Sequence, residues 1–193
     1  MRIGINQAVR IGMVAAAVLS AAGGAFGEEA QTLSKLASFG KPEKQPVRAE
    51  LVTEHASVQP GGKTRVGVQF DLDEGWHIYA HEPGDAGLPT KIQWSGPGSV
   101  SFGPLIWPKP QEFVDPGDIR TFGYSGSVVL ASEVRLSNSV VAGTPVTIRA
   151  MTEWLACKDI CLPGSAILEM SVPVMKTEPA LSTHARLFEH VND

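Results

Sequence analysis

The stretch Arg65-Val-Gly-Val-Gln-Phe-Asp-Leu72 decides the fold class, because its side chains alternate with a period of two. Successive side chains of a β-strand point to opposite faces. The four apolar residues at even positions 66–72 are therefore predicted to share a buried face, and the odd positions 65–71 the other face. This stretch predicts a half-buried strand.

The same period recurs along the chain. It places apolar residues on one face within 128–136, 146–154 and 166–172, and shorter strands are expected at 51–57, 76–80 and 91–94. Turns rich in Gly, Pro and Asp separate these segments. Seven or eight short strands in roughly 130 residues, 47–176, predict an all-β, immunoglobulin-like β-sandwich. The tail, 177–193, is expected to hold a short C-terminal helix, with helical spacing over Leu181–Val191.

The composition is that of one globular domain. Of the 193 residues 43% are hydrophobic and 19% charged, enough apolar material for a real core. The formal net charge is −4, and no basic stripe is present. This balance argues against binding to nucleic acid or to an anionic membrane surface, and indicates proteins as partners.

Residues 1–27 have the pattern of a secretory signal peptide. Arg2 and Arg10 form a positive leader, and a short apolar run follows. The segment Ala25-Phe26-Gly27 then places small residues where a signal peptidase needs them, so cleavage is expected near Gly27. The run is too short and too rich in Ala and Gly for a secure membrane span. Residues 28–46 are polar and read as a flexible lead-in. The mature chain is thus expected in a bacterial periplasm, without insertion into the membrane.

The two cysteines of the chain lie in the segment Trp154-Leu-Ala-Cys157-Lys-Asp-Ile-Cys161-Leu-Pro163. In an oxidising compartment such a pair closes on itself, but so short a ring stabilises the fold weakly. A tight turn is expected to hold the two Cα atoms about 6 Å apart, which suits both the bridged and the dithiol state. Thiol–disulfide exchange is therefore the leading hypothesis, with Lys158 as a nearby positive charge that Asp159 partly opposes.

Other interpretations of the pair remain open. A static structural bridge is the default for an exported protein. Copper or zinc binding would require further ligands, and no spacing ties His77, His81, Met151 or Met170 to the cysteines. A cysteine hydrolase would need a partnered histidine and would hardly carry a second cysteine so close by.

Four segments, in this order, carry a family resemblance: Gly75-Trp-His-Ile-Tyr79, Pro83-Gly-Asp-Ala-Gly-Leu-Pro-Thr90, Phe122-Gly-Tyr-Ser-Gly126 and Cys157-Lys-Asp-Ile-Cys161-Leu-Pro163. Together they resemble the N-terminal periplasmic domain of the DsbD family of thiol:disulfide interchange proteins. The ScsB-like branch, associated with suppression of copper sensitivity, is the most similar. The resemblance covers approximately residues 47–176.

The resemblance implies an immunoglobulin-like domain that acts as a component of a protein-disulfide reductase, without a metal or other cofactor. It implies that the pair passes electrons from a membrane-embedded thiol reductase to periplasmic thioredoxin-fold proteins, including factors of cytochrome c biogenesis. It also implies that Cys161 attacks partners and Cys157 resolves the mixed disulfide.

The resemblance further implies an aromatic cap over the pair, which a docking partner displaces. Phe122 and Tyr124 match the cap, and Tyr79 and Trp76 match the wall of the site. Trp154, three residues before Cys157, is the best placed of the other tryptophans.

Two departures from the family pattern matter. The spacer between the cysteines is shorter than in the best-studied branch. The sequence also carries neither a membrane domain nor a C-terminal thioredoxin-like domain, so the electron donor is expected to be a separate polypeptide. The competing hypothesis is a non-catalytic immunoglobulin-like interaction module with a static disulfide, in copper stress or cytochrome c assembly.

Overall fold

The computed structural model describes residues 45–115, 117–189 and 191. The predicted signal peptide (1–27), and all of the predicted lead-in (28–46) except Gln45 and Pro46, lie outside the described residues. Within the described part of the chain, no helix has the length and apolar character that crossing a membrane requires.

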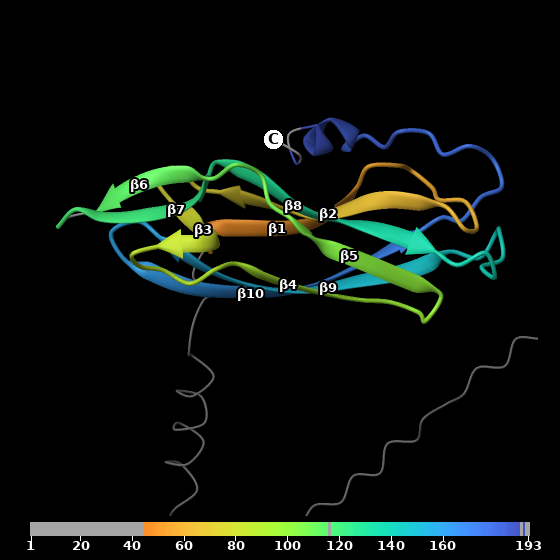
Figure 1. Cartoon of the computed structure of the whole chain (residues 1–193), viewed down its shortest axis with the longest axis horizontal. Helices are drawn as coiled ribbons and strands as arrows, with labels where there is room; N and C mark the ends of the chain where they lie inside the picture. Colours follow the sequence, from red (N-terminus) through yellow and green to blue (C-terminus); the bar gives the residue numbers. More distant parts are fainter. Residues whose placement is uncertain (1–44, 116, 190, 192–193) are drawn as a thin grey trace, which may run out of the picture. The chain divides into compact units, whose positions relative to one another are not determined.

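The described residues form two antiparallel sheets that pack as the two layers of a sandwich (Figure 1). One sheet has the strand order β1-β2-β8-β5, with bounds Val47–Thr53, Lys63–Leu72, Ser127–Leu136 and Val100–Ile106. The other has the order β10-β9-β3-β7-β6, with bounds Cys161–Val172, Val146–Cys157, His77–Gly84, Ile119–Ser125 and Gln111–Asp115. Strand β3 pairs only with the last two residues of β9, Ala156 and Cys157. Strand β4, Lys91–Ser95, pairs with the preceding part of β9, residues 149–153. The prediction of an immunoglobulin-like β-sandwich is confirmed.

The core lies between the two sheets and follows the predicted alternation. All four apolar residues at the even positions of β2 are buried, and so are the predicted inward residues of β8. Phe70 of β2 meets the indole of Trp154 of β9 edge-on, with 5.5 Å between ring centroids. The main cluster takes side chains from both sheets, so burial in this cluster holds the two layers together.

Three strands were not expected from the sequence. In β5 the pairing with β8 shifts register between Phe102 and Leu105, where Gly103 and Pro104 interrupt the alternation. Strands β6 and β7 form a hairpin whose pairing runs from Gln111–Gly123 to Asp115–Ile119. Glycines and prolines break the period of two in this part of the chain, which hid the strands.

The C-terminal segment packs on the outer side of the β1–β2–β8–β5 sheet (Figure 1, blue). The helix expected over Leu181–Val191 is a single 3-10 turn, Ala185–Phe188. Phe188 is fully buried against Val52, Val129 and Ala131. The outer face of this sheet is therefore partly covered by the chain's own tail.

Candidate functional site

Cys157 ends β9 and Cys161 begins β10, and a disulfide joins them. The two residues are direct partners in the antiparallel ladder, and the Lys158 amide donates a hydrogen bond to the Ile160 carbonyl inside the hairpin. The Cα atoms are 4.1 Å apart, shorter than the 6 Å expected across a turn, because the cysteines oppose each other directly across two strands. The pair therefore sits at the tip of a hairpin.

The two cysteines differ sharply in exposure. Cys157 is 3% exposed, whereas Cys161 is exposed to solvent, and Ile160 beside it is 61% exposed. A thiolate from another protein can therefore approach Cys161, while Cys157 is shielded. This asymmetry matches the roles that exchange demands, with one sulfur open to attack and one acting as an internal leaving group.

The ladder also fixes what lies beside Cys157. Strand β3 pairs with β9 so that His77 stands directly opposite Cys157 and Ile78 opposite Ala156. On its other side His77 pairs with Ser125 of β7. Directly paired residues share a face of the sheet, so the imidazole of His77 and the sulfur of Cys157 lie on the same outer face.

Aromatic rings enclose His77 on this face. The ring of Phe113, from β6, stacks on the imidazole with 4.4 Å between centroids and 17° between planes. Tyr79 meets it edge-on at 5.2 Å. The ring of Tyr79 is in turn covered by Gly87, where a Cβ would lie 2.3 Å from Cε1. Gly87 also has φ +96°, so both its backbone conformation and this contact favour glycine.

The side chains that the sequence assigned to a cap or wall are distributed over both faces. Tyr79 shares the outer face with the cysteines, as its place in the register requires. Tyr124 pairs with Ile78, so it and Phe122 face the core side, where they line a cleft of about 640 Å³ with Trp107. The cap role of Phe122 and Tyr124 remains a prediction, but the structure does not bring them together with the sulfurs.

The two tryptophans assigned to the site also belong to the core side. Trp76 packs against the main core cluster, and its amide donates to the Asp73 carbonyl in the turn before β3. Trp154 is buried, and its indole lies over Gly164, its partner on β10. Trp154 thus supports the hairpin that carries the cysteines from beneath.

Phe113 is the aromatic residue that the sequence reasoning missed. It lies in the short strand β6, and its pairing with Thr121 puts it on the outer face. The alternation Gln111-Glu-Phe113-Val was a signal for a strand, but only the topology places that strand beside His77.

Lys158 extends away from the sulfurs toward the turn between β2 and β3. Its ammonium donates a hydrogen bond of 3.2 Å to the Glu74 carbonyl, and its chain covers Gly75, where a Cβ would lie 2.8 Å from Cε and Nζ. The charge that the sequence offered as an activator of the thiolate is therefore engaged with the backbone in the disulfide form.

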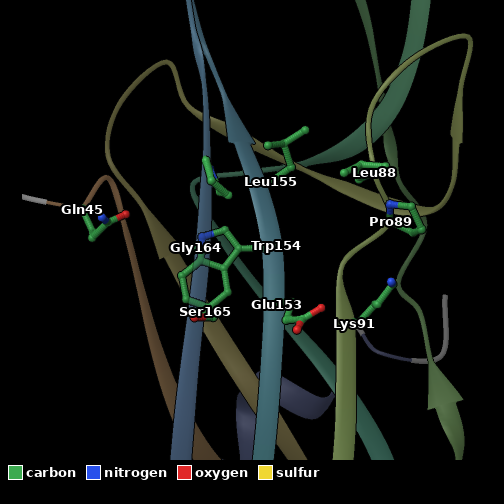
Figure 2. A pocket seen from close by; sticks show the side chains of 10 residues that line it. Gln45, Leu88, Pro89, Lys91, Glu153, Trp154, Leu155, Gly164 and Ser165 are labelled. Carbon is green, nitrogen blue, oxygen red and sulfur yellow. The ribbon is translucent and has the colours of Figure 1, made fainter.

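A groove of about 710 Å³ runs along the same face beside the hairpin (Figure 2). Its residues include the cross-strand pair Leu155 and Pro163, which follows the cysteine pair on the outer face. Figure 2 shows Leu88 and Pro89 of the loop before β4 alongside Leu155. The surface next to the exposed sulfur is therefore hollowed and largely apolar.

Comparison with known proteins places this geometry in a family. The model of the family "Thiol:disulfide interchange protein DsbD, N-terminal" matches residues 44–173. The chain belongs to this family. The DsbD N-terminal match ends shortly after β10, so the buried tail with Phe188 lies beyond it.

The fold agrees with that of a solved structure, and a second solved domain is similar in sequence. The N-terminal periplasmic domain of ScsB from Proteus mirabilis is 19% identical, with a TM-score of 0.56 over 78% of this chain, and the chain spans 56% of that structure. The DsbD N-terminal domain of Neisseria meningitidis, solved in the reduced form, is 20% identical over 64% of this chain and 86% of its own length, with a TM-score of 0.35. No curated protein sequence matches the chain.

Proposed function

We propose that this chain is a periplasmic thiol–disulfide exchange protein that relays electrons through Cys157 and Cys161. In this proposal a separate membrane-embedded thiol reductase supplies the electrons, and periplasmic thioredoxin-fold proteins receive them. Membership in the DsbD N-terminal family supports exchange chemistry in general. The observation that carries the proposal is the asymmetry of the pair, with Cys161 open at the tip of a hairpin and Cys157 buried.

The reaction is a transfer of two electrons and two protons. The Cys161 thiolate attacks a disulfide of the partner and forms a mixed disulfide, while the partner's other sulfur leaves and takes up a proton. Cys157 then loses its proton and attacks Cys161 Sγ, which releases the reduced partner and closes the Cys157–Cys161 bond. Reduction of the pair is the same sequence in reverse.

Strand pairing holds the hairpin together besides the bridge, and this favours exchange over a static bond. Strands β9 and β10 pair over twelve consecutive positions, from Cys161–Cys157 to Val172–Val146. The ring spans a sequence separation of only four, for which chain entropy predicts about 2 kcal/mol at most. The hairpin can thus persist in the dithiol form.

The test is to trap the partner. Cys157→Ser leaves Cys161 able to form a mixed disulfide that no second thiol can resolve, so the variant should accumulate a covalent adduct with its partner in the periplasm. Mass spectrometry of the adduct names that partner, and Cys161→Ser is the matched control, in which the remaining buried thiol should give little adduct.

The static-bridge hypothesis makes opposite predictions. An inert structural disulfide has a reduction potential well below about −300 mV, whereas a relay pair lies above it. Equilibration of the purified domain with glutathione gives this value. Absence of any adduct from Cys157→Ser, together with so low a potential, would leave an interaction module with an inert bridge.

A further inference from the structure

Breaking the Cys157–Cys161 bond leaves a charge in an unfavourable place. When an incoming thiolate attacks Cys161, the bond to Cys157 breaks and the Cys157 sulfur leaves with the electron pair as a thiolate. That sulfur belongs to a residue 3% exposed, so water stabilises the charge poorly. A proton delivered to the Cys157 sulfur would remove this cost.

His77 occupies the position from which such a proton can come. It is the direct cross-strand partner of Cys157, and directly opposed residues hold their Cβ atoms within about 4.5–5.5 Å. His77 is itself buried, at 6% exposed. The stacked ring of Phe113 and the edge-on ring of Tyr79 pack against its imidazole.

We propose that His77 is the proton donor and acceptor for the buried sulfur of Cys157 during thiol–disulfide exchange. This inference rests on the proposed function and specifies how its site works. When the pair is reduced, the His77 imidazolium gives its proton to the departing Cys157 thiolate and becomes neutral. When the pair is oxidised, neutral His77 takes the Cys157 proton as that sulfur attacks Cys161, so atoms and charge balance in both directions.

The other groups near Cys157 are less suited to this role. The Lys158 ammonium is turned to the Glu74 carbonyl, and a phenol such as that of Tyr79 ordinarily ionises near pH 10. Ser125, opposite His77 on β7, is engaged with Gln111 by a hydrogen bond of 2.8 Å. On β6 the residue that stacks on His77 is Phe113, which carries no titratable group. An imidazole is the side chain whose ordinary pKa allows it to give and take a proton near pH 7.

The kinetic test follows reduction of the oxidised protein by dithiothreitol as a function of pH. The measured rates are divided by the thiolate fraction of the reagent, so that only the protein's own titration remains. For the unmodified protein the corrected rate constant should fall as pH rises from 6 to 9, because the imidazolium is lost. His77→Phe keeps a ring to stack on Phe113 but has no ionisable proton to transfer. Its corrected rate constant should not change with pH, and at pH 6 it should be lower than that of the unmodified protein, on the order of 100-fold.

Two comparisons make the kinetic result specific. His77→Gln tests the same loss with a polar side chain, and it should give the same flat profile. His81→Gln removes an exposed imidazole that lies four residues further along the same strand, and it should leave the pH profile unchanged. A His77→Phe protein with the pH dependence of the unmodified protein would overturn the proposal.

A second measurement needs no variant. In the unmodified protein, NMR titration of the His77 ring protons should give different midpoints in the disulfide and dithiol forms, because the imidazole senses the Cys157 sulfur. Identical midpoints would contradict the proposal. These failures differ from failure of the proposed function, in which the pair would resist reduction altogether and Cys157→Ser would trap nothing.

Discussion

The indole of Trp154 lies over Gly164 across the β9–β10 pair, so closely that a Cβ at position 164 would stand 2.4 Å from its Nε1. Trp154 also meets Phe70 edge-on in the core, and this contact restricts how far the indole can move away from position 164. Glycine at 164 therefore joins the cysteine hairpin to the sandwich beneath it.

Gly164→Ala should consequently destabilise the domain by about 1–3 kcal/mol, the usual cost of overpacking. Urea unfolding measures the loss, and near-UV circular dichroism should report displacement of the indole. Gly98→Ala is the matched control, because no atom lies within 4 Å of its added Cβ. Equal unfolding free energies for the two variants would show that the indole of Trp154 moves aside with no loss of stability.

Shielding of the reduced pair should depend on Phe113. Its ring stacks on His77 beside Cys157, so Phe113→Ala should speed oxidation of the dithiol by hydrogen peroxide several-fold. The sequence-based assignment of the cap predicts the larger effect for Phe122→Ala instead. Free-thiol assays of the two variants, followed in time, decide between them, and unchanged rates in both would remove shielding by either ring.

Tyr124 should make the domain less stable in alkali. Burial raises the pKa of its phenol to about 12, and the hydroxyl donates a 2.8 Å hydrogen bond to the Pro108 carbonyl. The folded state therefore keeps a proton that the unfolded chain loses near pH 10, so this contribution is complete below pH 10 and lost as pH rises toward 12. Urea unfolding at pH 9 and 11 should show a smaller loss for Tyr124→Phe than for the unmodified protein.

The chain offers a direct optical check of that pKa. It has two tyrosines, so in Tyr79→Phe the phenolate absorbance reports Tyr124 by itself. Ionisation of this phenol near pH 10 would contradict the account of its burial.

The ion pair between Glu54 and Arg65 should matter for acid stability. The Arg65 guanidinium donates to both carboxylate oxygens of Glu54 and also to the Phe188 carbonyl, which ties the tail to β2. The hydrogen bond from Arg65, opposed by partial burial, lowers the pKa of the Glu54 carboxyl. Its contribution is thus present above the unfolded pKa and is lost as pH falls through the folded one.

Glu54→Gln should therefore cost about 2 kcal/mol at pH 7 and much less at pH 3, as measured by urea unfolding. The control is Glu169→Gln, whose partner Arg149 and own side chain are 60% and 53% exposed, so its effect should be under about 1 kcal/mol at either pH. If Glu54→Gln lowered the unfolding free energy equally at pH 7 and pH 3, the charge of the carboxylate would not be the source of the stabilisation.

The sequence predicts the fold well where alternation is unbroken. Val66–Leu72 shows its buried face directly, because each side chain's face follows from its parity. In Val128–Leu136 the even apolar positions are buried as predicted, but Val129 and Ala131 on the other face are buried as well, beneath the tail. Gly103, Pro104 and Gly123 interrupt that signal, so the strands that contain them were missed. Parity also separates His77 and Tyr79 from Ile78, but nothing local says that β3 lies beside Cys157.

The site was therefore predictable only in part. The spacing of the two cysteines and the predicted signal peptide indicate the redox pair, and the short sequence motifs indicate the family. Phe113 and His77 acquire their place from pairing between strands far apart in sequence, which depends on the topology of the whole sheet. The burial of Phe188 likewise depends on a groove formed by Val52, Val129 and Ala131, on two other strands.

The most direct measurement is the redox state of Cys157 and Cys161 in growing cells. Acid quenching followed by alkylation with a mass-shifting reagent separates dithiol from disulfide on a gel. The account predicts a substantial dithiol fraction that disappears when the membrane thiol reductase is deleted. A pair found fully bridged under every growth condition, with the reducing pathway active, would contradict it.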